Sequence, residues 1–169
     1  MPRWHCASSG LGLDLSREQL AEQPARLVLE HGSALVMPFG DGAVDKCYSV
    51  EAAQHFEDRT AFATEARRVL RPGGKLCAAP FFATDESAPG DGIDYAVPIE
   101  AFRAGLHEVG FADVRVESIG DRVRQGFDTW VSQTQCKGSW GRNWLKANRA
   151  GLADYFLVTA SVSRVTSRK

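Results

Sequence analysis

The segment Val69-Leu70-Arg71-Pro72-Gly73-Gly74 spans the junction of a helix, a breaker and a strand. Upstream of it, apolar side chains recur at the spacing of one helix face, which predicts a helix over residues 59–70: Phe62, Ala66, Val69 and Leu70. Pro72 cannot continue that helix, and it pushes Arg71 out of the α region. The two glycines leave the backbone free to turn into a strand over residues 75–80.

A second apolar run, Val44–Val50, comes before this helix and predicts a buried strand. The order strand, helix, turn, strand is how a parallel α/β sheet is built. The remaining pattern predicts short strands at 11–15, 27–30, 113–119 and 155–162, and helices from 17, at 99–109 and over most of 127–150. The sequence therefore indicates an α/β fold.

Length and composition limit the function classes. A chain of 169 residues suits one domain, 1–169, with an irregular start at 1–10 and a frayed tail at 164–169. The net charge of −1 argues against nucleic acid as the main partner. No apolar run approaches the ~20 residues that span a bilayer, and residues 1–20 lack the apolar core of a signal peptide. We therefore expect no membrane partner and a cytoplasmic location.

The four cysteines are widely spaced and form no C-x-x-C pair: Cys6, Cys47, Cys77 and Cys136. Two of them fall within apolar strand patterns. Buried thiols in a reducing compartment are therefore expected in place of disulfides or a metal site.

Four short motifs follow one another in a fixed order: Gly12–Ser16, Ser33–Phe39, Asp45–Phe56 and Arg68–Gly74. With this order and spacing, the chain from Leu11 to Val162 resembles the S-adenosyl-L-methionine (SAM)-dependent methyltransferases of class I, of the UbiE/type 11 small-molecule group. The resemblance implies a Rossmann-like sheet that is mostly parallel and has an antiparallel last strand. It also implies SAM as the cofactor.

The resemblance implies that seven residues hold SAM: Asp14, Leu15, Ser33, Ala34, Met37, Ser49 and Glu51. Asp14 stands where the family's carboxylate accepts hydrogen bonds from both ribose hydroxyls. The alternative is a solvated carboxylate at a strand end. Ser33 lies in the adenine loop, at a position where the family often has aspartate. Glu51 stands where an acidic or polar residue faces the methionine end of SAM.

His55 is the candidate catalytic residue. The resemblance implies that it takes the proton from an acceptor hydroxyl, and imidazole suits this role because its pKa lies near neutrality. The alternative is a histidine that caps the next helix or faces solvent. Residues 84–95 form a polar segment that could close over the acceptor. Three aromatic side chains could either wall an acceptor pocket or belong to the core: Phe81, Phe82 and Tyr95.

The chain departs from the family at its start. The family opens with a strand and a glycine-rich loop about 20 residues before the acidic residue, whereas thirteen residues precede Asp14. The expected sheet is therefore truncated at the N-terminus and lacks the first strand. Three outcomes stay open: direct pairing of the second and fourth strands, completion by a second copy in a homodimer, or a fragment of a longer reading frame.

Two functions from different classes remain. The first is SAM-dependent methyl transfer to a small-molecule acceptor. O-methylation of a metabolite is the first hypothesis, and C-methylation is the second. The second is a non-catalytic scaffold or fragment, derived from a methyltransferase, that binds a partner or ligand. The absent glycine loop and Ser33 favour the scaffold, and Asp14, Glu51 and His55 favour the enzyme.

Overall fold

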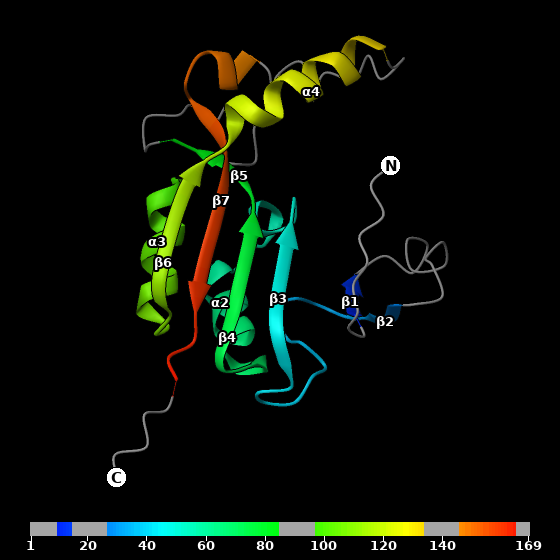
Figure 1. Ribbon diagram of the computed structural model, residues 1–169, viewed down its shortest axis with the longest axis vertical. Helices are drawn as coiled ribbons and strands as arrows, with labels where there is room; N and C mark the ends of the chain where they lie inside the picture. The colour runs from blue at the N-terminus through cyan, green and yellow to red at the C-terminus, as the bar shows by residue number, and fades with distance from the viewer. Residues whose placement is uncertain (1–9, 15–26, 85–96, 134–145, 165–169) are drawn as a thin grey trace.

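A five-stranded sheet forms the body of the computed structural model, which describes residues 10–14, 27–84, 97–133 and 146–164 (Figure 1). Its strands are β3 (Val44–Val50), β4 (Leu70–Ala79), β5 (Phe81–Ala83), β6 (Ala112–Ser118) and β7 (Ala153–Ser161). β3 pairs with β4 in parallel, whereas β7 runs antiparallel to β4, β5 and β6. The mixed sheet with an antiparallel last strand confirms the predicted fold class.

The first two strands form a separate parallel pair. β1 (Gly10–Asp14) pairs with β2 (Leu27–His31) from Gly10 opposite Leu27 to Asp14 opposite His31. The pair lies beside β3 in Figure 1, and Leu13 packs against the main hydrophobic core. Among the described residues β1 is hydrogen-bonded only to β2, so direct pairing of the second and fourth strands, one of the three expected outcomes, does not occur.

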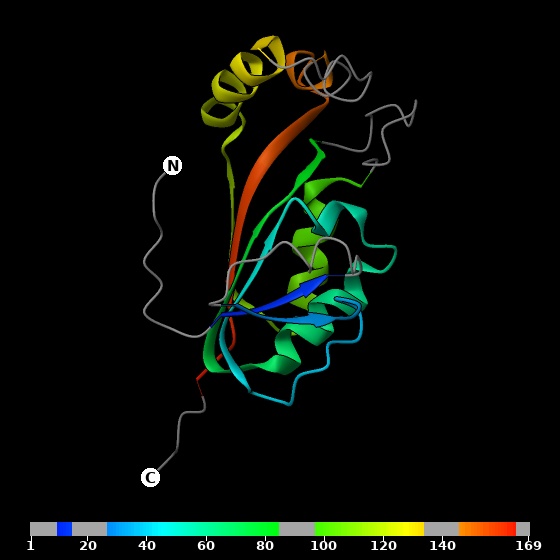
Figure 2. The ribbon, with the colours of Figure 1, turned by 90° about the vertical axis from the view of Figure 1, so that its right-hand side faces the viewer.

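Two helices cover one face of the large sheet (Figure 2). α2 (Arg59–Val69) is capped by Asp58, whose carboxylate accepts a hydrogen bond from the Ala61 amide at 2.8 Å. α3 (Ile99–Glu108) follows β5. The predicted apolar face of α2 is confirmed, since Phe62, Ala66 and Val69 are buried.

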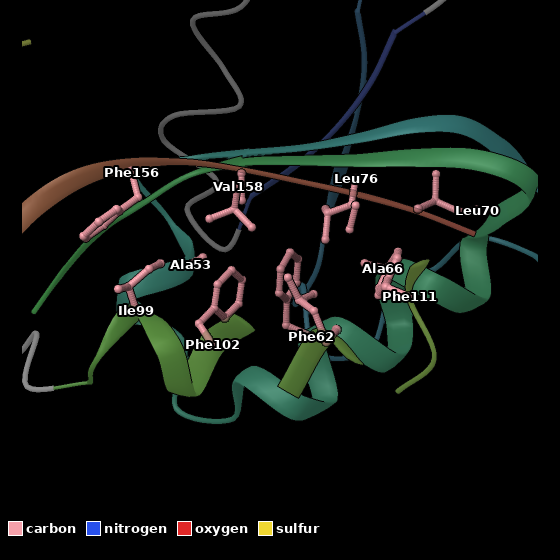
Figure 3. Close-up of a cluster of buried hydrophobic side chains, with 14 of the residues drawn as sticks. Ala53, Phe62, Ala66, Leu70, Leu76, Ile99, Phe102, Phe111, Phe156 and Val158 are labelled. Atoms are coloured by element: carbon pink, nitrogen blue, oxygen red, sulfur yellow. The ribbon is translucent and has the colours of Figure 1, made fainter. Parts of the chain in front are cut away.

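The core between the helices and the sheet is apolar and closely packed (Figure 3). The large side chains that are at most 2% exposed include Phe62, Leu76, Phe82, Leu106 and Val158. The rings of Phe82 and Phe102 lie 5.3 Å apart between their centroids. Phe82 therefore belongs to this core, whereas Phe81, 3% exposed, lies in a second buried cluster with Ala147, Ala153 and Tyr155. Tyr95 lies outside the described residues.

The predicted turn at Arg71–Gly74 is wrong in one respect, because strand β4 already begins at Leu70. The Gly73 amide donates to the Val162 carbonyl at 2.9 Å, and the Val162 amide donates to the Gly74 carbonyl at 2.9 Å. Gly73 adopts a φ of +78°, which glycine tolerates best. The Pro-Gly-Gly residues therefore form a bulge within β4, where the register with β3 shifts between Val44 and Lys46.

The later elements differ in their bounds. α4 (Gly120–Gln133) begins before the predicted start at 127, and a short helical stretch follows at 146–149. β6 and β7 begin one and two residues before the predicted 113 and 155. The three-residue strand β5 was not predicted. The expected helix from 17 and most of the 84–95 segment lie outside the described residues.

No helix among the described residues is long and apolar enough to cross a membrane. In the same residues no group of three or more histidine, cysteine, aspartate or glutamate side chains is placed to hold a metal ion. Cys47 and Cys77 are free thiols on neighbouring strands. Burial raises the pKa of Cys47 to about 11 and also raises the pKa of Cys77, whereas Cys6 and Cys136 lie outside the described residues.

Candidate functional site

The predicted nucleoside-binding residues lie at the ends of β1 and β2. Asp14 is the last residue of β1 and pairs with His31 of β2, while Leu15 lies outside the described residues. Ser33 follows β2 in a tight turn, in which the Ser33 hydroxyl accepts a hydrogen bond from the Leu35 amide at 3.1 Å. The carboxyl ends of these two parallel strands therefore meet at one edge, where open α/β sheets bind ligands.

The loop after β2 is held to helix α2 by two charged side chains, Glu65 and Arg68. The Met37 amide donates to Glu65 Oε2 at 2.7 Å. Arg68 donates from Nη2 to the Met37 carbonyl at 3.0 Å and from Nη1 to the Phe39 carbonyl at 2.7 Å. The helix thus binds both backbone groups of Met37, a predicted cofactor residue.

Arg68 and Glu65 also bind each other. Arg68 Nε donates to Glu65 Oε1 at 2.7 Å, and Arg68 Nη2 donates to Glu65 Oε2 at 2.8 Å. The bond from Arg68, helped by the Met37 amide, holds the pKa of Glu65 below its usual value although burial opposes this shift. The same bonds, and one to Asp41 at 2.8 Å, raise the pKa of Arg68. We refer to Glu65, Arg68 and the Met37–Phe39 backbone as the loop clamp.

The sequence reasoning did not identify the loop clamp, since Arg68 entered only as part of a motif. A signal was present: Glu65 and Arg68 stand at i and i+3 with opposite charges on one helix. Their partners lie about 30 residues earlier in the chain. Helix periodicity does not reveal contacts of that range.

The second group of predicted residues follows β3. Ser49 is buried, 6% exposed, and its Oγ has no hydrogen-bond partner among the described residues. His55 is exposed and ends the short 3-10 helix η1 (Ala53–His55). Gln54 is 3% exposed, and its Oε1 is likewise without a partner in the described part of the chain. These buried polar atoms are left available for a polar ligand.

Glu51 is the first residue after β3 and adopts a φ of +50°, which is uncommon outside glycine. Its amide donates to the Ala79 carbonyl at 3.0 Å, and its Oε1 accepts a hydrogen bond from the Tyr155 hydroxyl at 2.9 Å. Burial, followed by the bond to Glu51, raises the pKa of Tyr155. The phenol therefore remains a donor at neutral pH.

Arg59 lies beneath this loop at the start of α2. Its Nη2 donates to the Gln54 carbonyl at 3.0 Å, and its guanidinium carbon lies 5.7 Å from the centre of the Phe82 ring. Burial lowers the pKa of Arg59. The arginine thus ties the loop after β3 to the core of the sheet.

The predicted residues therefore fall into two groups. Asp14, Ser33, Ala34 and Met37 belong to the β1–β2 side, and Ser49, Glu51 and His55 belong to the end of β3. The donors and acceptors available fit a ligand such as SAM, with a diol at one end and an ammonium group at the other. Among the described side chains, Glu51 presents an exposed carboxylate at the end of β3.

Known proteins similar to this chain are methyltransferases. Residues 4–78 match the model of the methyltransferase domain family. The erythromycin 3''-O-methyltransferase of Saccharopolyspora erythraea is 33% identical over 152 residues, which cover 75% of this chain and 50% of that protein. The 27-O-demethylrifamycin SV methyltransferase of Amycolatopsis mediterranei is 26% identical, with 67% of this chain and 49% of that protein covered. The chain thus spans about half the length of these curated relatives.

Solved structures share the fold. The geranyl diphosphate C-methyltransferase of Streptomyces coelicolor A3(2) superposes with a TM-score of 0.79 at 13% identity, over 91% of this chain and 62% of that one. The phosphoethanolamine N-methyltransferase 2 of Haemonchus contortus, in complex with SAM, gives a TM-score of 0.71 at 18% identity, over 92% of this chain and 44% of that one. The matched model and the curated relatives show that this chain is similar in sequence to methyltransferases, and the superpositions show that it has their Rossmann-like fold.

Proposed function

We propose that this protein transfers a methyl group from SAM to a hydroxyl group of a small metabolite. The observation that carries the proposal is the polar loop at the carboxyl end of β3, which holds Ser49, Glu51 and His55 at the edge where such sheets bind ligands. The two curated relatives described above are named as a 3''-O-methyltransferase of erythromycin and a methyltransferase of 27-O-demethylrifamycin SV, which supports a small-molecule acceptor. C-methylation is the second choice, as the geranyl diphosphate enzyme illustrates.

Seven residues hold the cofactor in this proposal: Asp14, Leu15, Ser33, Ala34, Met37, Ser49 and Glu51. The bound cofactor supplies a methyl group on a sulfonium, which is already a good leaving group. The chain therefore contributes mainly proximity and orientation. Asp14 accepts hydrogen bonds from the ribose diol, and the loop clamp keeps the Met37 backbone in place beside the adenine.

His55 acts as the general base. It lies in η1, exposed to solvent, immediately after the loop that carries Glu51. A neutral imidazole nitrogen accepts the proton of the acceptor hydroxyl as the oxygen attacks the methyl group. Because the side chain is exposed, a bulky acceptor can reach it.

The proposal includes one domain over 1–169, a location in the cytoplasm, and neither nucleic acid nor a membrane as partner. The free thiols of Cys47 and Cys77 fit a reducing compartment. A homodimer that completes the sheet is also proposed, because the described residues leave one edge of β3 without a strand partner.

A non-catalytic scaffold is the second candidate. The Ser33 hydroxyl accepts a hydrogen bond from its own turn, so it offers less to an adenine than an aspartate would. Tyr48 and Val50 of β3 are 65% and 68% exposed, which gives a partner an apolar surface.

Methyl transfer from labelled SAM to hydroxyl-bearing metabolites of the relatives' substrate class separates the two candidates. We expect turnover by the full chain, loss of cofactor binding in Asp14→Ala, and loss of turnover with retained binding in His55→Asn. Asp121→Ala is the matched control, because Asp121 forms an exposed ion pair on α4. A chain that binds no SAM at millimolar concentration supports the scaffold and rules out the enzyme.

A further inference from the structure

Tyr155 and Glu51 meet over the end of β4 although 104 residues separate them in sequence. β3 and β7 are the two neighbours of β4, so a side chain from each reaches across its carboxyl end. The Tyr155 hydroxyl donates to Glu51 Oε1 at 2.9 Å. This contact joins the candidate site to the last strand of the sheet.

The tyrosine end of this contact is rigid. Tyr155 is 7% exposed and packs with Phe81, Ala147 and Ala153. It pairs with Phe81 across β5 and β7. Its amide donates to Asp154 Oδ1 at 2.8 Å, so backbone and ring are both held.

The glutamate end is strained and otherwise exposed. Glu51 adopts a left-handed conformation at the end of β3, and such strain persists only where surrounding contacts over-determine it. Its amide is bonded to Ala79 and its Oε1 to Tyr155. Among the described residues its second oxygen, Oε2, has no partner, which leaves one carboxylate oxygen free to accept a bond from a ligand.

We infer that Tyr155 is a positioning residue that fixes Glu51, so that Oε2 accepts a hydrogen bond from the ammonium group at the methionine end of the cofactor. The inference rests on the proposed function, since it needs a SAM-binding chain. A carboxylate held by a buried donor loses little conformational entropy when the ammonium binds. Recognition of the ammonium thus depends on a hydroxyl that never touches the cofactor.

The test compares S-adenosylhomocysteine with its des-amino analogue, which lacks only the ammonium group, by calorimetric titration of the full chain. We expect the wild-type chain to bind S-adenosylhomocysteine more tightly than the analogue. Tyr155→Phe should weaken the binding of S-adenosylhomocysteine by about tenfold and leave the affinity for the analogue unchanged. Glu51→Gln should give a similar loss, and Tyr155→Phe should add nothing to it. Tyr48→Phe is the matched control, because it removes the hydroxyl of a tyrosine that is 65% exposed on β3.

Three results would overturn the inference. If Tyr155→Phe weakens the binding of both ligands equally, the role of Tyr155 is merely structural. If it leaves the binding of both ligands unchanged, Tyr155 has no role in recognition. Additive effects of Tyr155→Phe and Glu51→Gln show that the two residues act separately. If the wild-type chain binds neither ligand, the proposed function itself is refuted. This outcome differs from the other three, because in each of those the wild-type chain binds S-adenosylhomocysteine. Circular dichroism at the titration temperature checks that each variant is folded.

Discussion

Replacing Glu65 by glutamine removes the charge of the loop clamp without changing the size of the side chain. Three hydrogen bonds meet at the two oxygens of this carboxylate: from the Met37 amide at 2.7 Å, from Arg68 Nε at 2.7 Å and from Arg68 Nη2 at 2.8 Å. The side chain of Glu65 is 16% exposed, so solvent screens these bonds only in part. The substitution therefore tests whether the clamp stabilises the fold.

The magnitude follows from the number of acceptors. A glutamine side chain has one acceptor oxygen, so at least one of the three donors faces an NH₂ group instead. A hydrogen bond to a charged group contributes about 1.5–3 kcal/mol. We therefore expect Glu65→Gln to lower the free energy of unfolding by about 2 kcal/mol and the melting temperature by roughly 4–8 °C.

The effect also depends on pH. The folded-state pKa of Glu65 is lowered, chiefly by its bond to Arg68. The carboxylate thus stabilises the fold fully above its unfolded pKa of about 4.3, and this stabilisation is lost as the pH falls through the lower folded pKa. The gap in stability between the wild type and Glu65→Gln should stay constant from about pH 7 to pH 5 and close below about pH 4.

Urea denaturation at several pH values, followed by circular dichroism, measures this gap. Glu57→Gln is the control, because Glu57 is exposed and the same chemical change there should shift stability by less than about 0.5 kcal/mol. A Glu65→Gln variant as stable as the control at pH 7, or a gap in stability that widens as the pH falls, would show that the Glu65 carboxylate does not stabilise the fold.

Three further predictions concern the fold and the thiols. Gly120→Ala should lower the free energy of unfolding in urea by about 1–3 kcal/mol, because its Cβ would lie 1.6 Å from Asp154 Oδ1. Gly126→Ala on the same helix meets open space and should be neutral or stabilising, and equal effects would contradict the prediction. Phe82→Ala should cost about 3–5 kcal/mol in the same assay, since the side chain is fully buried and packs on Phe102; a loss below about 1 kcal/mol would show a loosely packed core. Cys47, whose pKa is about 11, should react with iodoacetamide at pH 8 more slowly than free glutathione, as measured by peptide mass spectrometry. A rate equal to that of glutathione would show that the partly buried thiol is not shielded from solvent.

Local pattern predicted the elements that carry their own signal. The strand Val44–Val50 has the predicted bounds, and α2 ends one residue before the predicted 70, because polar or breaking residues bound both segments. The prediction that this strand is buried is wrong: Ser49 alone is buried in it and Tyr48 and Val50 are exposed, because among the described residues β3 pairs only with β4 and lies at an edge. The start of β4 was misplaced because Gly73 and Gly74 pair with Val162 near the other end of the chain. A Pro-Gly-Gly segment predicts a turn unless such a long-range partner is known.

The candidate site was predictable only in part. The motifs located Asp14 at the end of β1 and Glu51 at the end of β3, since strand ends are marked by the change from apolar to polar residues. The supports of these residues were not predictable. Arg68 contacts a loop about 30 residues earlier, and Tyr155 contacts Glu51 across 104 residues, and neither pair leaves a periodic signal.

Calorimetric titration of the full chain with S-adenosylhomocysteine tests most directly whether this protein holds a methyltransferase cofactor. We expect saturable binding with one ligand per chain, abolished by Asp14→Ala and preserved in Asp121→Ala. Absence of binding at millimolar ligand to a chain shown to be folded, or binding that Asp14→Ala leaves unchanged, would contradict this expectation.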